Sequence, residues 1–152
     1  MNYEVNGYSD EELSAISKSN PDTMTVEELL KAATLTSDLN EQLRIYKEAE
    51  RLYPQDYRTA NNVGYVLFQQ GKSAEAEAEF QKANSIMDNP VSTNNLGVIA
   101  RQKGERVKAA ELFAKAGAAG PDGKYNQGII AITNGNYAIA NSELPDQNTF
   151  ND

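Results

Sequence analysis

An asparagine, an apolar residue and a glycine recur 33 positions apart, and this recurrence restricts the possible folds more than any other feature of the sequence. The first copy is Asn62-Val63-Gly64 and the second is Asn95-Leu96-Gly97. Four more positions recur in phase with them: Gly71, Ala76, Phe80 and Ala83 return as Gly104, Ala109, Phe113 and Ala116. Such a period is typical of a solenoid built from pairs of helices.

The glycines of the two copies fall inside the predicted first helix of each pair. A glycine there destabilises a helix by about 1 kcal/mol relative to alanine. Because this cost is repeated at Gly64 and Gly97, we expect a packing reason, namely a neighbouring helix pressed against the bare backbone. The second helix of each pair offers alanine, phenylalanine and alanine at spacings of four and three, which is a narrow apolar stripe.

Capping-box sequences predict where the helices ahead of the clear repeats begin. Ser9 and Thr25 are each followed three positions later by a glutamate, so a short helix should follow Ser9 and a longer one should follow Thr25 and run through Thr36. Apolar residues three or four apart then predict a helix over 39–53. This pair has the length of the later units but lacks their glycines, so we interpret it as a degenerate first repeat.

These features divide the chain into two regions. Residues 1–22 form an N-terminal extension that combines a possible strand remnant of a preceding domain with a short helix. Residues 23–152 form the repeat domain. Its approximate repeats are 23–56, 57–89, 90–120 and 121–144, followed by a truncated or frayed tail.

The fourth repeat is predicted from a third copy of the pattern. Asn126-Gln127-Gly128 follows the second copy at a slightly shorter spacing than the second follows the first, and the pattern fails after Ala140. A solenoid normally closes with a polar-faced capping helix, and none is encoded here. We therefore expect incomplete cover for Ala131, Ile132 and Ile139, and we predict a homodimer through this uncapped C-terminal end.

Composition excludes several classes of function. The net charge is −8, whereas a nucleic-acid-binding domain usually carries a basic face, so we expect no nucleic acid partner. No apolar run approaches the roughly 18 residues of a membrane span, so we expect no membrane insertion by this segment. The 152 residues include no histidine and no cysteine, which removes the commonest general base, the usual zinc ligand and any thiolate metal site. We expect no enzyme activity, no metal and no cofactor.

The spaced residues resemble the tetratricopeptide repeat (TPR), a helix–turn–helix unit of about 34 residues. The match is strong over 57–144 and weak over 23–56. The resemblance implies an all-α fold, a right-handed α-solenoid of about four helix–turn–helix units whose first helices line a concave groove. It also implies a protein-interaction scaffold, because the usual activity of the family is to hold a peptide or protein segment in that groove.

The groove residues follow from the positions that line it in the family. We expect a peptide-binding groove formed by Arg58, Asn61, Asn62, Tyr65, Phe68, Asn94, Asn95, Val98, Arg101, Tyr125, Asn126 and Ile129. Asparagine offers a donor and an acceptor together, so a ladder of asparagines can bond the backbone of an extended peptide without reading its side chains. Two alternatives stay open: the asparagines bond neighbouring helices within the scaffold, or the groove is filled by a missing C-terminal part of the protein.

A narrower resemblance concerns the context of the domain. The run from Thr25 to Thr36, with Asp56-Tyr57-Arg58 beyond it, is similar to the repeat segment of outer-membrane-protein-A-like proteins of gram-negative bacteria. This resemblance implies a fragment of a larger cell-envelope protein and a periplasmic location. Without it we expect a cytoplasmic protein. It also implies an alternative function, a structural spacer or packing platform.

Overall fold

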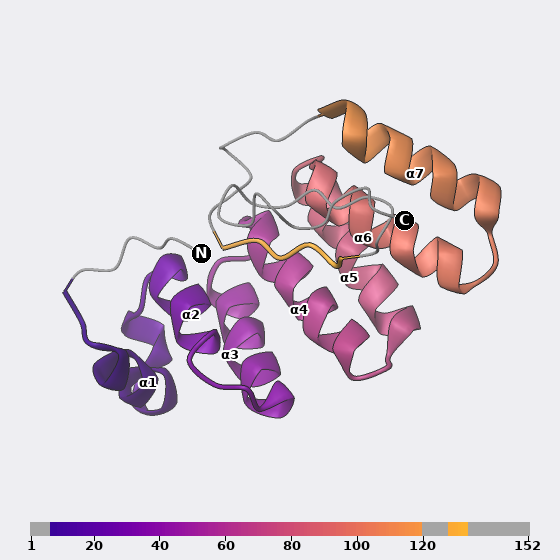
Figure 1. Ribbon diagram of the computed structural model, residues 1–152. Coiled ribbons are helices and arrows are strands. Elements are labelled where there is room, and N and C mark those ends of the chain that lie inside the picture. The colour runs from indigo at the N-terminus through magenta and orange to yellow at the C-terminus, as the bar shows by residue number, and fades with distance from the viewer. Residues whose placement is uncertain (1–6, 120–127, 134–152) are drawn as a thin grey trace.

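Helices make up most of the chain that the computed structural model describes, which is residues 7–119 and 128–133 (Figure 1). They are α1 (Asp10–Ser19), the short 3-10 helix η1 (Pro21–Thr23), α2 (Val26–Ala33), α3 (Leu39–Leu52), α4 (Tyr57–Gln69), α5 (Ser73–Ile86), α6 (Pro90–Gln102) and α7 (Arg106–Ala119). Within these described residues there is no strand, and none of the helices is long and apolar enough to span a membrane.

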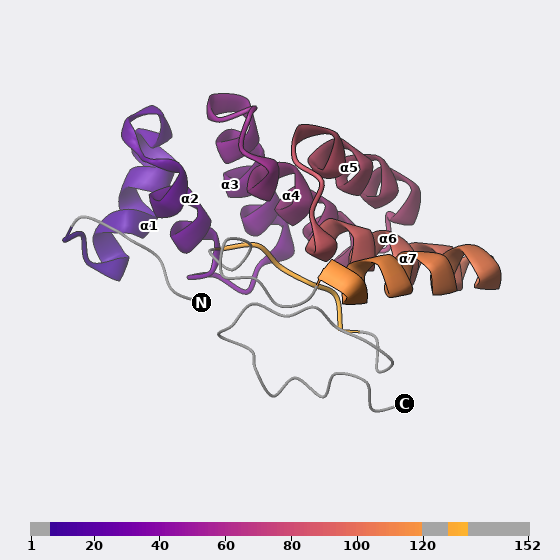
Figure 2. The same ribbon diagram turned by 90° about the horizontal axis from the view of Figure 1, so that it is seen from above.

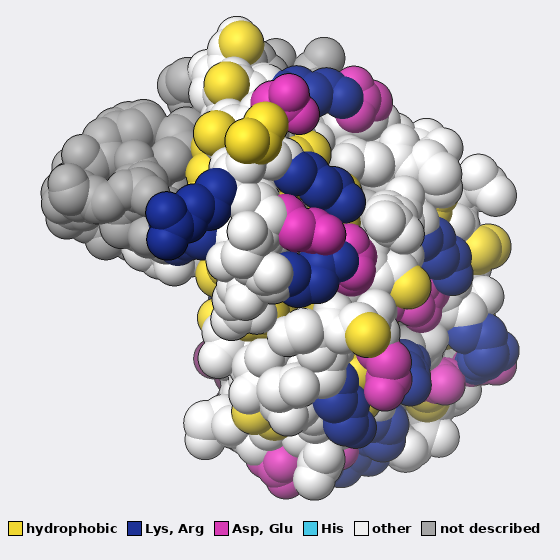
Figure 3. Space-filling view, turned by 90° about the vertical axis from the view of Figure 1, so that its right-hand side faces the viewer, with side chains coloured by type: hydrophobic (Ala, Val, Ile, Leu, Met, Phe, Trp, Pro, Cys, Tyr) yellow, Lys and Arg dark blue, Asp and Glu magenta, His cyan; other side chains and the backbone are white. Residues whose placement is uncertain are grey.

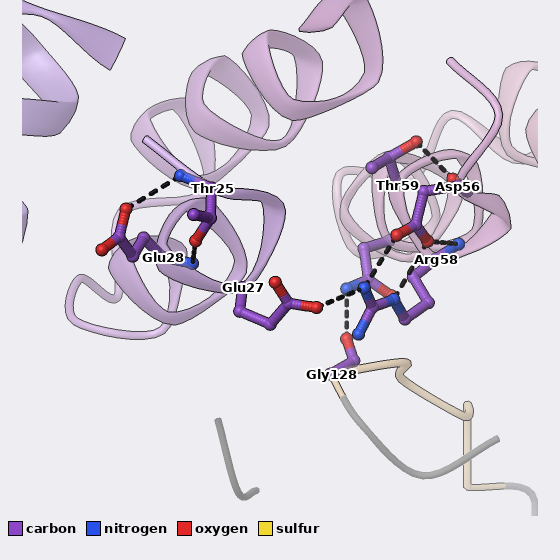
Figure 4. A network of polar contacts seen from close by, with 8 residues as sticks. Thr25, Glu27, Glu28, Asp56, Arg58, Thr59 and Gly128 are labelled. Atoms are coloured by element: carbon purple, nitrogen blue, oxygen red, sulfur yellow. Dashed lines mark hydrogen bonds and ion pairs between the residues drawn. The ribbon is translucent and has the colours of Figure 1, made fainter. Parts of the chain in front are cut away.

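The helix starts predicted from the capping boxes are confirmed. Ser9 Oγ accepts a hydrogen bond from the amide of Glu12 at 3.1 Å, and the Glu12 carboxylate accepts one from the amide of Ser9 at 2.8 Å. Thr25 and Glu28 make the same two bonds at 3.1 and 2.8 Å (Figure 4). Each box satisfies two backbone donors that the first turn of a helix leaves free. The helix after Thr25 ends at Ala33, short of the predicted Thr36.

The repeated glycines have the packing reason that the sequence predicts. A β-carbon on Gly64 would lie 2.7 Å from Cε1 of Phe80, and one on Gly97 would lie 2.6 Å from Cε1 of Phe113. Any side chain at these two positions would overlap the aromatic ring. The bare backbone of α4 therefore seats the ring of α5, and the backbone of α6 seats the ring of α7 in the same way.

The helices pack in chain order, each chiefly on the helices before and after it. Three pairs, α2 with α3, α4 with α5 and α6 with α7, make up the described part of the repeat array (Figures 1 and 2). The α1 helix of the N-terminal extension packs on α2, and its Leu13 is fully buried in the same apolar cluster as the first repeats. The possible strand at the N-terminus lies outside the described residues, apart from Gly7.

The predicted fourth repeat is wrong over residues 128–133. These residues are extended, and they run along the side of the array that α4 and α6 form (Figure 2). We call this side the inner face and residues 128–133 the inner segment. Ile132 is only 6% exposed there, so the expected incomplete cover is also wrong for this residue. The other residues of the predicted fourth repeat, Ile139 among them, lie outside the described residues.

A physical reason for the difference lies in the composition of the inner segment. Its residues include three isoleucines and a threonine, and β-branched side chains favour extended backbone. On the inner face an extended backbone also finds hydrogen-bond partners that a helix would not need. The spacing of the third copy favours a helix, but these two factors favour the extended form.

Candidate functional site

Four buried asparagines form the centre of the inner face. Asn61 and Asn62 come from α4, and Asn94 and Asn95 occupy the equivalent positions of α6, one repeat further along the chain. All four side chains have no exposed surface. A buried amide that lacks a partner is costly, so such residues are expected to be fully hydrogen-bonded. We call these four residues the asparagine ladder.

Two members of the ladder each hold a carbonyl and an amide of the inner segment. Asn62 Nδ2 donates to the Gly128 carbonyl at 2.5 Å, and Asn62 Oδ1 accepts from the amide of Ile130 at 3.1 Å. Asn95 Nδ2 donates to the Ile130 carbonyl at 3.0 Å, and Asn95 Oδ1 accepts from the amide of Ile132 at 2.8 Å. Each of these asparagines therefore spans the backbone from one carbonyl to the amide two positions later.

The other two members add one bond each. Asn61 Nδ2 donates to the Ile130 carbonyl at 2.9 Å, and Asn94 Nδ2 donates to the Ile132 carbonyl at 3.1 Å. The same bonding pattern therefore recurs along the segment. Moving from the asparagines of one repeat to those of the next advances the contacts by two residues of the bound backbone. All these bonds go to backbone atoms of the segment, so they do not depend on its side chains.

Hydrogen bonds within the scaffold hold the asparagine side chains in place. Asn61 Oδ1 accepts from Ser92 Oγ at 2.9 Å and from Asn95 Nδ2 at 3.0 Å, which joins α4 to α6. Asn61 Nδ2 also donates to Asn62 Oδ1 at 3.1 Å, and Asn94 Nδ2 donates to Asn95 Oδ1 at 3.2 Å. The asparagines bond both the neighbouring helix and the extended backbone, so the two readings of the sequence are not exclusive.

Side chains of the inner segment pack alternately on two apolar clusters, as in a β-strand. Ile130 and Ile132 contact the larger cluster, which contains Val98. Ile129 and Ala131 belong with a second cluster, which contains Val91 of α6 and Tyr57 of α4. Ile129 has no exposed surface, whereas Ile130 and Ala131 are half-buried. The inner face therefore contacts both sides of the extended backbone.

Arg58 lies where the inner segment reaches the inner face. Its guanidinium is 2.7 Å from the Asp56 carboxylate and 2.9 Å from the Glu27 carboxylate, and its side chain is 13% exposed. Burial alone would lower the pKa of Arg58, but hydrogen bonds to these two carboxylates raise it above its ordinary value. Figure 4 shows Gly128 beside this guanidinium, with its carbonyl oxygen toward it. Arg58 is therefore a fixed cation at one end of the site.

The remaining residues predicted for the groove fall in three places. Tyr65, Phe68 and Val98 belong to the larger apolar cluster, and burial raises the pKa of the Tyr65 hydroxyl. Arg101 lies 5.4 Å above the ring of Phe113, on the side of its own helix pair. Tyr125 and Asn126 lie outside the described residues. Ile129 was predicted as part of the groove wall, and this is wrong because it belongs to the segment that occupies the inner face.

The sequence carried a signal for the inner segment that the repeat spacing concealed. A short run of branched aliphatic residues bounded by Gly128 and by an Asn-Gly pair is typical of a strand. Sequence reasoning also missed Ser92, whose hydroxyl orients Asn61, and Asn89, whose Oδ1 accepts from the amide of Ser92 at 2.8 Å at the start of α6. Asparagine before a proline-led helix is a recognisable cap.

The end of the array at α7 differs from the inner face. Basic and acidic side chains are interspersed on it (Figure 3), and an ion pair of 3.2 Å joins Lys103 to Glu77. Val107 on α7 is 74% exposed. This end shows no extended field of one sign in the view of Figure 3, and the homodimer predicted through the C-terminal end stays a prediction.

A solved structure with a similar arrangement is a thermophilic TPR protein from Thermus thermophilus. The TM-score is 0.59, and the match covers 70% of this chain and 61% of that chain at 21% sequence identity. The fold is that of a TPR protein. At this identity the likeness concerns the fold alone. No family model matches the sequence, and no curated protein matches it. In TPR terms, α4 and α6 are the first helices of two consecutive repeats, and the ladder lies on them.

Proposed function

We propose that this chain is a non-catalytic protein-interaction module of TPR fold that holds an extended peptide or protein segment on its inner face. The observation that carries the proposal is the asparagine ladder, which bonds successive carbonyls and amides of an extended backbone. A TPR fold is compatible with a general scaffold role. The use of the inner face for a partner is our inference.

The chemistry of the ladder favours binding to main chain. Each asparagine amide has both donors and an acceptor, so it can satisfy a peptide carbonyl and a peptide amide together. The bonds from Ser92 and between ladder members fix the amides before a ligand arrives. Binding then loses less side-chain entropy than binding to a flexible surface would.

The same residues are poorly suited to catalysis. The inner face is built from amides and apolar side chains, and neither group exchanges a proton or attacks a carbonyl near neutral pH. The Arg58 guanidinium at the end of the site is paired with two carboxylates. This composition is that of a recognition surface.

A titration that detects weak binding tests the proposal. The full chain, labelled with ¹⁵N, is titrated to millimolar concentration with an unlabelled peptide that has the sequence of residues 127–134. We expect the backbone amide signals of α4, α6 and the inner segment, which every variant retains, to shift. The double variant Asn62→Ala/Asn95→Ala should lose the response. Asn40→Ala is the matched control, because Asn40 is exposed on α3, and it should retain it. Equal responses in the ladder variant and the control would reject the inner face as the binding site.

A second candidate function is a packing platform within a larger protein, with the inner face as an internal joint. The observation that favours it is that a segment of the same chain already covers this face. On this reading the inner segment stabilises the fold and no outside peptide binds at any concentration. The resemblance to envelope proteins, and the periplasmic location that follows from it, remain proposals. Fractionation of cells that express the natural protein with a tag would test the location.

A further inference from the structure

We propose that the inner segment is an internal competitor for the inner face, and that the outside ligand is an extended peptide with the same pattern. The pattern is glycine, then four residues of which the first and the fourth are branched aliphatics. This inference rests on the proposed function, because it takes the inner face to be a peptide-binding site. It adds the class of the ligand and the way in which access is controlled.

The inner segment is held in the manner of a ligand. The hydrogen bonds of the ladder described above join asparagine side chains to its backbone, and none of them uses one of its side chains. Any extended peptide offers the same carbonyls and amides with the same dipeptide period. The backbone bonds therefore give affinity without distinguishing the cis segment from an outside peptide, and selectivity has to come from the side chains.

Side-chain burial identifies the positions of the segment at which the scaffold can select between side chains. Ile129 has no exposed surface and Ile132 is 6% exposed, so each sits against the scaffold with no room for solvent. Ile130 and Ala131 are half-buried, and Thr133 is exposed. A charged side chain in place of Ile129 or Ile132 would be buried without a partner, which strongly disfavours binding. We expect the positions of Ile130 and Ala131 to be more permissive, and the position of Thr133 to be free.

Gly128 sets the position before the aliphatic run. Its φ is +83°, a conformation that residues with a side chain rarely adopt. Its carbonyl accepts from Asn62 and faces Arg58 (Figure 4). A ligand that reproduces this geometry needs glycine there, which makes the recognised pattern more specific than an aliphatic run alone.

The covalent connection gives the cis segment its advantage. The α7 helix ends at Ala119, so only the stretch 120–127 separates it from Gly128. A short tether of this kind holds a segment at an effective concentration in the millimolar range. An outside peptide therefore competes with the inner segment, and its apparent affinity is reduced by the fraction of molecules whose inner face is free.

The test compares one peptide on three forms of the full chain. The probe is a fluorescently labelled peptide with the sequence of residues 127–134, and the readout is anisotropy. The chains are the natural sequence, an opened variant Ile129→Asp/Ile132→Asp, and a control Thr133→Asp that adds charge at the exposed end of the segment. We expect the opened variant to bind the peptide at least about tenfold more tightly than the natural chain. The control should bind like the natural chain.

Further outcomes separate the inference from the proposed function. Equal affinity for the opened and natural chains would overturn the competitor role while leaving the inner face as a peptide site. Absence of binding to every form would overturn the proposed function as well. Peptides with aspartate at the first or the fourth residue after the glycine should bind the opened variant at least about tenfold more weakly than the unchanged peptide does. Undiminished binding would overturn the pattern.

Two controls keep the result interpretable. Far-ultraviolet circular dichroism checks that the opened variant keeps its helices, and if it does not, Gly128→Val provides a second opened variant because valine disfavours the positive φ. Light scattering over a range of concentrations checks whether the segment exchanges between copies. A dimer of the natural chain that the opened variant cannot form would mean that the occupant comes from a second copy, which would overturn the cis assignment.

Discussion

Replacing Gly64 with alanine sets two effects of known sign against each other. Helix propensity alone favours alanine over glycine by about 1 kcal/mol in the middle of a helix. The added β-carbon would lie 2.7 Å from Cε1 of Phe80, whereas carbon atoms in ordinary contact are about 3.5–4.0 Å apart. The ring would have to move by about 1 Å, and Phe80 is fully buried.

The steric effect should exceed the effect of propensity. Inserting a methyl group into a well-packed core destabilises a protein by about 1–3 kcal/mol. After the gain in propensity is subtracted, we expect Gly64→Ala to lower the free energy of unfolding by about 1 kcal/mol. In a chain of this size that corresponds to a decrease in Tm of about 2–4 °C.

Urea denaturation followed by circular dichroism measures this difference. Ala78→Gly, at an exposed position of α5, is the control for propensity and should itself destabilise by up to about 1 kcal/mol. Adding Phe80→Leu to Gly64→Ala should cost less than Phe80→Leu costs in the natural chain, because the smaller side chain leaves room for the methyl group. If Gly64→Ala instead stabilises the protein by about 1 kcal/mol, propensity dominates and the packing argument for the repeated glycines fails.

The other predictions concern titration and the ladder. Burial, together with the hydrogen bond and charge of Glu50, raises the pKa of Glu79 to about 7 from an ordinary value of 4.5. The native state therefore binds more protons than the unfolded state between these values, so stability should fall as the pH rises through this window. Glu79→Gln should flatten that slope in urea denaturation at pH 5, 6 and 7.5, and an unchanged slope would contradict the assignment. Asn95→Leu leaves the Ile132 amide without its acceptor, so its hydrogen exchange should become at least about tenfold faster, with Asn40→Leu as the control. Unchanged protection would mean that Asn95 does not hold the segment.

Much of the helical array could be predicted because its signals are local. The capping boxes at Ser9 and Thr25 use residues three apart, and the mid-helix glycines of α4 and α6 each meet an aromatic residue of the very next helix. Such features depend little on the rest of the chain. The recurrence of asparagine likewise marked the residues that form the ladder, before the identity of their partner was known.

The inner segment could not be predicted in the same way, because its conformation is decided by contacts between distant residues. Gly128 to Thr133 carry a repeat-helix spacing and a high β propensity at once. The choice between them depends on Asn62 and Asn95, which belong to earlier repeats and lie far away in sequence. The spacing of residues along the chain carries no information about hydrogen bonds to distant residues. Spacing alone therefore predicted a helix here.

One repeat of the scaffold binds one dipeptide of the extended backbone, so the site fixes the register of a bound chain in steps of two residues. If a bound chain slipped by a single position, every side chain would turn to the opposite wall and the ladder would face the wrong amides, whereas a slip by two would restore both. Ligands should therefore be compared by the wall that each apolar side chain faces, because the first and fourth positions of the pattern face opposite walls, as Ile129 and Ile132 do. Each additional asparagine-bearing repeat would bind two more residues of an extended ligand, so the number of repeats sets the length of the peptide that the protein can hold.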